Sequence, residues 1–304
     1  MQLRKRYGAP VPRERLDLQE RDYLILELLN RHGPLPTNYL FALTRHLGAH
    51  ETHLRDRLAM LRHGFVTPDG EHVTYLYLPA WQGKNNYRKL IYDVTPHGLT
   101  ALERKNIRPI KRRSEHALHR FMGSTVSASV ATYIQQARRL DFFDQNDILA
   151  HPKIHDERRI EDYPFSIPLG KSRIDPDDFF AIQDPLDMRK DLTVYAVEYD
   201  RNKETLADDK ARNSVGGKMV KYDEAIATDA FEKHLGIRNR TVHVLFITNN
   251  ERHKLNMQKW CKANVKHHNR FRFASVKGFH TDYWEIPGLM LVKVEDCEGT
   301  TVEL

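Results

Sequence analysis

The chain has 304 residues, of which 29% are charged and 40% are hydrophobic, and its formal net charge is +7. This apolar content is too high for a wholly disordered chain, and a mean hydropathy of -0.64 without a long apolar run argues against a membrane-spanning segment. The length suits two domains of ordinary size. We therefore expect a soluble, two-domain protein that does not bind membranes.

The positive charge is concentrated in the N-terminal part of the chain. Residues 1–120 contain 21 Lys and Arg against 12 Asp and Glu, whereas the remaining 184 residues contain 27 against 29. Clustered cations gain affinity for a polyanion by releasing counterions from its phosphates. The asymmetry predicts a nucleic-acid-binding module joined to a near-neutral one, with a solubilising basic surface as the alternative.

The cysteines and the N-terminus predict the cellular compartment. Cys261 and Cys297 are the only cysteines, which is too few for a disulfide framework. Residues 1–12 are basic but lack the apolar stretch of a secretory signal. We expect a cytoplasmic location, where thiols stay reduced.

Three short helices are predicted within the first 64 residues. Apolar side chains recur at helical spacing over residues 18–29, 39–47 and 54–61, and a glycine follows closely after each run. An aspartate, Asp17, is expected to cap the first helix and Thr37 the second. Helices of this size with tight connections are typical of a helix-turn-helix core.

Strand-like segments follow the third predicted helix. Residues 65–67, 73–78 and 88–94 have strand composition, and a helix is predicted to begin at 95–98. Three helices and a β-hairpin make a winged helix, which presents its third helix to a DNA groove. We expect this domain to span residues 1–105 and a basic linker to span residues 106–114.

Cations of the third helix and of the wing are the candidate DNA contacts. The wing residues would contact the DNA phosphates and contribute little to recognition of a particular base sequence. The alternatives are a solvated helix face and a winged helix that binds proteins. The candidate DNA-binding residues are Arg55, Arg57, Arg62, Lys84, Arg88 and Lys89.

Carboxylates lie next to two apolar runs in the second predicted domain, residues 115–304. Asp177 precedes the run 179–182, and Glu198 and Asp200 end a strand that starts at 194. Because side chains alternate along a strand, Glu198 and Asp200 share a face. With Asp177 from the neighbouring strand, they predict an all-oxygen site for Mg²⁺ or Mn²⁺. Glu204 is a further candidate ligand.

A helix predicted from Asp208 or Asp209 to Tyr222 carries a lysine, Lys218, toward these carboxylates. Phosphodiester cleavage requires stabilisation of negative charge and an activated water, which a metal ion with a nearby lysine supplies. Asp177, Glu198 and Lys218 are therefore the predicted catalytic residues of a metal-dependent nuclease. The alternatives are a turn at Asp177 and an exposed, ion-paired strand end at Glu198.

The order of several motifs resembles the replication-relaxation family of plasmid and mobile-element proteins, and the related mobilisation relaxases built on the PD-(D/E)XK nuclease fold. The order is a winged helix, "EHAL", "PD", "VEYDRNKE", a helix with Lys218 and Tyr222, and "VLFITNNERHKL", within residues 17–260. The resemblance implies an α+β protein with a restriction-endonuclease-like α/β domain at 115–304. It also adds His116 and Tyr222 as weaker site candidates.

One position departs from the PD-(D/E)XK pattern. In that pattern a lysine follows the second carboxylate by two residues, whereas Asp200 follows Glu198 here. Either Lys218 has taken over the lysine's role from the following helix, or the domain has kept the fold and lost cleavage.

Two functions are compatible with these observations. The first is a metal-dependent DNA nicking endonuclease of plasmid replication, relaxation or mobilisation that acts on double-stranded DNA. The second is a non-catalytic DNA-binding accessory or regulator whose nuclease-like domain contacts proteins of a replication or transfer complex. Residues 266–273 and Trp284 mix cations with aromatic rings, so they are candidates for stacking on single-stranded DNA or for core strands.

Overall fold

The computed structural model describes residues 15–48, 50–79, 89–110, 117–138, 140–150, 165–186, 192–200, 214–276 and 293–302. The chain divides between Pro109 and Ile110 into two compact units. Both units combine helices with β-strands, in agreement with the expected α+β class. Within the described residues, no helix is long and apolar enough to cross a lipid bilayer.

The N-terminal unit begins with three helices, as the sequence predicts. They are α1 (Glu20–His32), α2 (Thr37–Thr44) and α3 (Glu51–His63). The cap of α1 is Gln19 rather than Asp17, because Asp22 Oδ2 accepts a hydrogen bond from the Gln19 amide at 2.7 Å. Helix α2 ends at Thr44 and a 3₁₀ turn, η1 (Arg45–Leu47), continues to Gly48. Leucines from the three helices are fully buried, namely Leu26, Leu29, Leu40, Leu54, Leu58 and Leu61.

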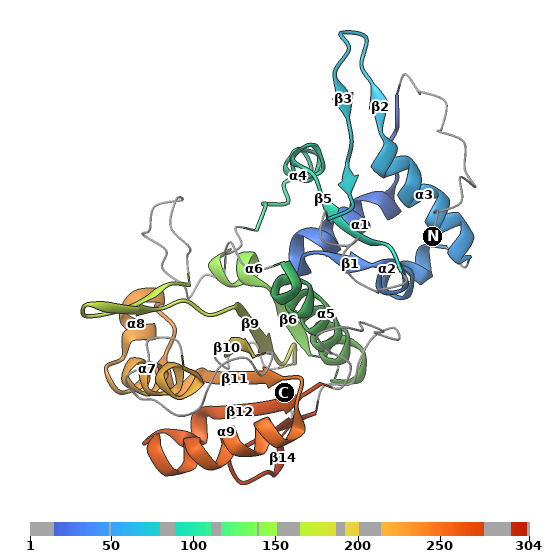
Figure 1. Cartoon of the computed structure of the whole chain (residues 1–304). Helices are drawn as coiled ribbons and strands as arrows, with labels where there is room; N and C mark the ends of the chain where they lie inside the picture. The colour runs from blue at the N-terminus through green and yellow to red at the C-terminus, as the bar shows by residue number, and fades with distance from the viewer. Residues whose placement is uncertain are drawn as a thin grey trace. The chain divides into compact units, whose positions relative to one another are not determined.

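Strands complete the N-terminal unit. Antiparallel strands β1 (Leu35–Pro36), β5 (Ile91–Val94) and β4 (Leu76–Tyr77) form one sheet in that order, and α4 (Pro96–Glu103) follows β5. Strands β2 (Phe65–Val66) and β3 (His72–Val73) form a separate hairpin that projects beyond α3 (Figure 1). The single strand predicted over 73–78 is therefore two short strands, β3 and β4.

Gly64 makes the passage from α3 to this hairpin possible. Its φ is +66°, a left-handed conformation that residues with a side chain rarely adopt. A Cβ at this position would also overlap the carbonyl oxygen of Val73. Both the backbone conformation and the close approach of the Val73 carbonyl therefore require glycine where α3 ends.

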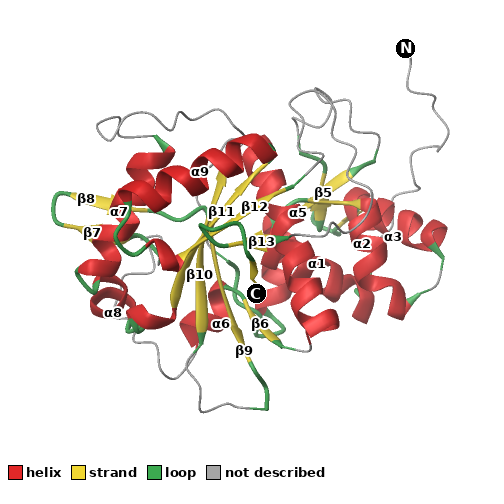
Figure 2. Cartoon of the chain, turned by 90° about the horizontal axis from the view of Figure 1, so that it is seen from below, coloured by secondary structure: helices red, strands yellow, loops and turns green. Residues whose placement is uncertain are grey.

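The C-terminal unit is built on a mixed β-sheet whose strand order is β14-β13-β12-β11-β10-β9-β6. Strands β10, β11 and β12 are parallel, and the flanking strands join antiparallel. Figure 2 shows these strands together with the surrounding helices. The strands are β6 (Asp141–Phe143), β9 (Asp178–Gln183), β10 (Thr193–Asp200), β11 (Val242–Thr248), β12 (Phe271–Ser275), β13 (Val294–Glu295) and β14 (Thr301–Val302). A separate hairpin consists of β7 (Ile167–Leu169) and β8 (Ser172–Ile174).

Helices cover both faces of this sheet (Figure 1). Helix α5 (Ala117–Tyr133) packs on one face, where Gly123 lies against the ring of Tyr199. On the other face α7 (Val215–Ala227), α8 (Ala230–Leu235) and α9 (Glu251–Asn264) enclose the main core with Val194 and Ala196 of β10. A short helix, α6 (Gln145–Ala150), follows β6. Successive residues of β10 therefore face different helices.

The segment considered for single-stranded DNA contributes strand β12. Phe271 and Phe273 are fully buried in the core, so these two rings are not available for stacking on bases. For them the core-strand interpretation is correct, because alternate residues of β12 point into the sheet's main core. Trp284 lies outside the described residues.

Arg57, a predicted DNA contact, instead joins α3 to the start of α1. Its Nη2 pairs with Asp22 Oδ2, its Nε donates to Asp22 Oδ1 at 2.8 Å, and Nη2 also donates to the Asp17 carbonyl at 2.7 Å. The Asp22 side chain is 0% exposed and that of Arg57 is 12% exposed. The sequence could not show that Asp22 removes this cation from the exposed face of α3.

We predict that Arg57→Ala destabilises the N-terminal unit by about 3 kcal/mol, because it leaves the buried Asp22 carboxylate without its partner. The matched control is Arg55→Ala, which breaks only an exposed ion pair with Glu51 and should cost less than about 0.5 kcal/mol. Urea denaturation of both variants measures the two costs. Equal losses would contradict the structural role of Arg57.

Candidate functional site

Glu198 is the carboxylate around which the candidate site is built. It lies on β10, on the face covered by α7, and is 3% exposed. Tyr222 OH donates a hydrogen bond to Glu198 Oε1 at 2.7 Å, and Lys218 Nζ lies 3.0 Å from Glu198 Oε2. Lys218 and Tyr222 stand one turn apart on α7 and so share a helix face. The structure thus brings together the predicted catalytic pair Glu198 and Lys218 and the weaker candidate Tyr222.

The N-terminus of α7 sets the position of Lys218. Ser214 caps the helix by accepting a hydrogen bond from the Gly217 amide at 3.0 Å. Gly216 and Gly217 are buried in the first turn of the helix. Residues 208 and 209, where the sequence places the helix start, lie outside the described residues.

Asp177 lies beside Glu198 because it continues the β9–β10 ladder. Val197 pairs with Asp178, the Asp177 amide donates to the Val197 carbonyl at 2.9 Å, and the Tyr199 amide donates to Asp177 Oδ2 at 2.8 Å. His119 Nε2 of α5 lies 3.1 Å from the same oxygen. Asp177 is therefore held by backbone and by an imidazole that the sequence pattern did not single out.

The charges of Asp177, Glu198 and Lys218 depend on one another. Burial and then the negative charge of Asp177 raise the pKa of Glu198 to about 7, although Lys218 and Tyr222 favour its ionised form. Burial also opposes ionisation of Asp177, but His119, Lys218 and the Tyr199 amide together hold the pKa of Asp177 below its usual range. Two carboxylates whose pKa values are pushed apart next to one amine are typical of a functional site.

Asp200, a predicted metal ligand, has a different partner. It follows Glu198 on the same face of β10, and its Oδ2 lies 2.6 Å from His253 Nε2 of α9. The side chains of Asp200 and His253 are 4% and 9% exposed. Asp200 is thus engaged with α9, whereas Glu198 is engaged with α7. Glu204 lies outside the described residues.

The side chains of Asp177 and Glu198 provide the type of ligand atom, carboxylate oxygen, that a hard divalent cation prefers. Both offer carboxylate oxygens, and the buried Glu198 Oε2 has no hydrogen-bond donor in good alignment, since Lys218 approaches it as an ion pair. Mg²⁺ often binds through one or two carboxylates and keeps several waters. Within the described ranges, no group of three or more His, Cys, Asp or Glu side chains is placed to hold a metal ion. Of the predicted trio, Asp177 and Glu198 influence each other's charge, whereas Asp200 pairs with His253 of α9.

The remaining candidates are spread over the N-terminal unit and the start of the second unit. Arg55 is exposed and pairs with Glu51 at 2.6 Å, and Arg62 Nη2 lies 2.7 Å from His63 Nε2. Lys89 is exposed. Lys84, Arg88 and His116 lie outside the described residues. It is His119, not a residue of the "EHAL" motif, that contacts the site in the described part of α5.

Comparison with known proteins gives one result. Residues 26–241 match the family described as replication-relaxation. This range begins within α1, contains Asp177, Glu198, Lys218 and Tyr222, and ends one residue before β11. No curated protein and no solved structure matches the chain.

We predict that Glu198→Gln flattens the dependence of stability on pH. The usual pKa of Glu198 is 4.5, whereas its folded value is about 7. The folded protein therefore keeps a proton that the unfolded chain releases, so this stabilisation is complete below pH 4.5 and is lost as the pH rises through 7. The loss amounts to at most about 3 kcal/mol. Urea denaturation between about pH 5 and about pH 8 measures it. If the free energies of unfolding of the two proteins change in parallel with pH, Glu198 has its usual pKa in the folded protein.

Proposed function

The chain belongs to the replication-relaxation family, and from that membership we propose that it is a DNA-binding protein of plasmid or mobile-element replication, relaxation or mobilisation. We further propose that its N-terminal unit is a winged helix that binds double-stranded DNA. The C-terminal unit, in this proposal, is a PD-(D/E)XK-type nuclease that nicks DNA with Mg²⁺ or Mn²⁺.

The ion pair between Lys218 and Glu198 is the observation that carries the nuclease proposal. Asp200 occupies the position that the PD-(D/E)XK pattern gives to lysine, so an amine has to come from elsewhere. Helix α7 supplies one 3.0 Å from Glu198 Oε2, close enough to Asp177 to lower its pKa. The order of elements adds support: helix α5 is followed by strands β6, β9 and β10, helix α7 and strand β11, with α6, β7, β8 and α8 between them, and this includes the helix, strands, helix and strand that the sequence predicts.

Each residue of the site has a role in this reaction. Asp177 and Glu198 would hold the metal ion, which when bound supplies Lewis acidity and an activated water. Lys218 stabilises the negative charge that develops on the phosphate. Tyr222 and His119 position the two carboxylates through Glu198 Oε1 and Asp177 Oδ2.

Charge and exposure support the DNA-binding proposal for the N-terminal unit. The first 120 residues contain nine more cations than anions, whereas the rest of the chain is near neutral. Arg55 and Lys89 are exposed and Arg62 is partly exposed. Such cations bind phosphates by an electrostatic term that weakens with salt.

A second candidate function is a DNA-binding accessory or regulator with an inactive nuclease-like unit. The contacts of Glu198 favour this accessory function. Tyr222 contacts one of the two carboxylate oxygens of Glu198 and Lys218 contacts the other, and a pKa of about 7 leaves Glu198 partly protonated. In this case the C-terminal unit would serve to contact other proteins of a replication or transfer complex.

We predict that the protein converts supercoiled plasmid to the nicked form with Mg²⁺ or Mn²⁺, and that Glu198→Ala and Lys218→Ala slow nicking by about 100-fold or more. The two substitutions remove a metal ligand and the cation beside the phosphate. The rate of nicking on agarose gels measures the effect.

Lys221→Ala is the control, because Lys221 lies on the same helix and has no contact with Glu198 among the described residues. It should nick at the wild-type rate. Nicking by the Glu198 variant at the wild-type rate would reject the proposed site, and DNA binding without nicking under either metal would favour the accessory function.

A further inference from the structure

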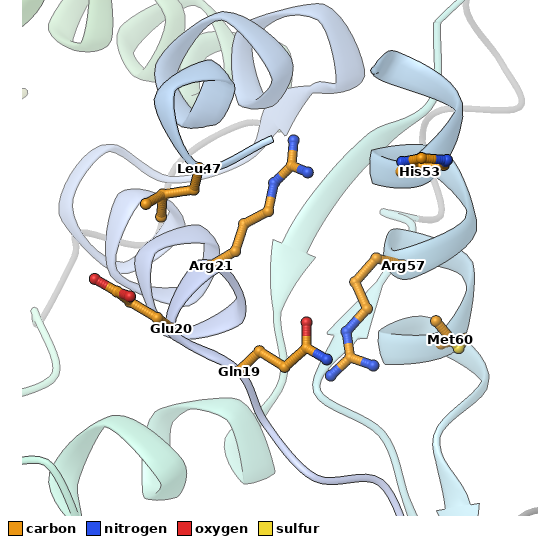
Figure 3. Close-up of a pocket in the computed structure, with 7 residues that line it drawn as sticks. All are labelled: Gln19, Glu20, Arg21, Leu47, His53, Arg57 and Met60. Carbon is orange, nitrogen blue, oxygen red and sulfur yellow. The ribbon is translucent and has the colours of Figure 1, made fainter. Parts of the chain in front are cut away.

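A pocket of about 390 Å³ lies in the N-terminal unit between the start of α1, the turn η1 and α3. Figure 3 shows Arg21 extending from α1 and Arg57 from α3 into the space between these elements. Leu47 and Met60 add apolar surface to it. Neither Arg21 nor this pocket is singled out by the sequence pattern.

The two arginines are not equivalent. Arg57 is neutralised by the buried Asp22, as described above. Arg21 forms no ion pair with any described residue; its Nε and Nη2 reach only Thr44 Oγ1, at 3.4 and 3.3 Å. Burial lowers the pKa of Arg21, yet arginine stays charged at any physiological pH. The pocket therefore contains one guanidinium that forms no direct ion pair with a described residue, although the charge of the nearby Asp22 favours its ionised form.

The position of the Arg21 guanidinium is fixed from two sides. Thr44 donates its own hydroxyl proton to the Leu40 carbonyl at 2.7 Å, which leaves its oxygen free to accept from Arg21. On the other side Gly48 approaches so closely that a Cβ there would overlap Arg21 Nη1. A guanidinium held in one orientation binds the oxygens of a phosphate with less loss of conformational entropy.

The other lining residues suit a nucleic-acid backbone. His53, exposed on α3, adds ring nitrogens to the lining of the pocket, and Leu47 and Met60 offer apolar contact for a sugar. Glu20 is the one carboxylate among the described lining residues, and it is exposed to solvent. The pocket adjoins α3, the helix proposed to enter the DNA groove.

We propose that this pocket binds a phosphate of the DNA backbone through the guanidinium of Arg21, with His53 beside it. The proposal rests on the DNA-binding function proposed for the N-terminal unit. In this proposal a residue at the start of α1 contacts a phosphate, and this contact sets the orientation of α3 on the DNA duplex. Such a contact adds affinity without sequence information.

The test is a salt titration of binding to a double-stranded oligonucleotide of random sequence, measured by fluorescence anisotropy. Each phosphate contact contributes about 0.9 to the slope of log K against log salt concentration. Arg21→Ala should lower this slope by about 0.9. Arg21→Lys should restore most of it, because the ammonium keeps the charge in the pocket.

Gly48→Ala separates the position of Arg21 from its charge. The φ of Gly48 is 174°, an extended conformation open to any residue, so alanine brings no backbone strain. Its methyl group displaces the guanidinium, and the slope should fall as it does in Arg21→Ala although no charge is lost. Arg31→Gln, which removes a cation paired with Glu27 near the end of α1, should leave the slope unchanged.

Three results decide the matter, with thermal unfolding of each variant recorded alongside. A reduced slope in Arg21→Ala and Gly48→Ala, and a wild-type slope in Arg31→Gln, support the phosphate pocket. Wild-type slopes in Arg21→Ala and Gly48→Ala overturn it while leaving DNA binding intact. Failure of the wild-type protein itself to bind the duplex overturns the DNA-binding function and the pocket together.

Discussion

A carboxylate buried at the end of β10 is the constraint on which the C-terminal unit depends. An isolated ionised Glu198 would cost several kcal/mol to bury, so the fold surrounds it with partners. Lys218 offers a positive charge and Tyr222 a hydroxyl, and both come from one face of α7. These contacts offset only part of the cost, which is why its pKa stays near 7. Glu198 is thus a buried carboxylate whose negative charge is compensated only in part by its described partners.

Helices from both faces of the sheet converge on this end of β10. His119 of α5 contacts Asp177, and His253 of α9 contacts Asp200, on either side of Glu198 in the chain. Asp177, which precedes β9, contacts α5, whereas Glu198 and Asp200 share a face of β10 and contact α7 and α9. The two imidazoles fix the flanking carboxylates and leave Glu198 to α7. Asp177 groups with Glu198 because its negative charge helps to raise the pKa of Glu198, whereas Asp200 pairs with His253.

Local patterns predicted much of this arrangement. Alternation in β10 placed Glu198 and Asp200 on one face, and the helical spacing of Lys218 and Tyr222 placed them together. Three helices of the N-terminal unit were predicted from apolar periodicity with glycines at their ends. Partners that are distant in sequence could not be predicted in this way. The ion pair of Arg57 with Asp22, and the pairs of His119 and His253 with their aspartates, exist only after the chain has folded.

The most direct test of a metal site at Glu198 is isothermal titration calorimetry with Mn²⁺ near neutral pH, in buffers of different ionisation enthalpy. A metal ion binds only the ionised carboxylate, so binding should release the proton that Glu198 holds. With a pKa of about 7, Glu198 should release roughly half a proton per ion at pH 7. Glu198→Gln should abolish that release. Absence of Mn²⁺ binding, or binding with the same proton release in the variant, would contradict a metal site at this carboxylate.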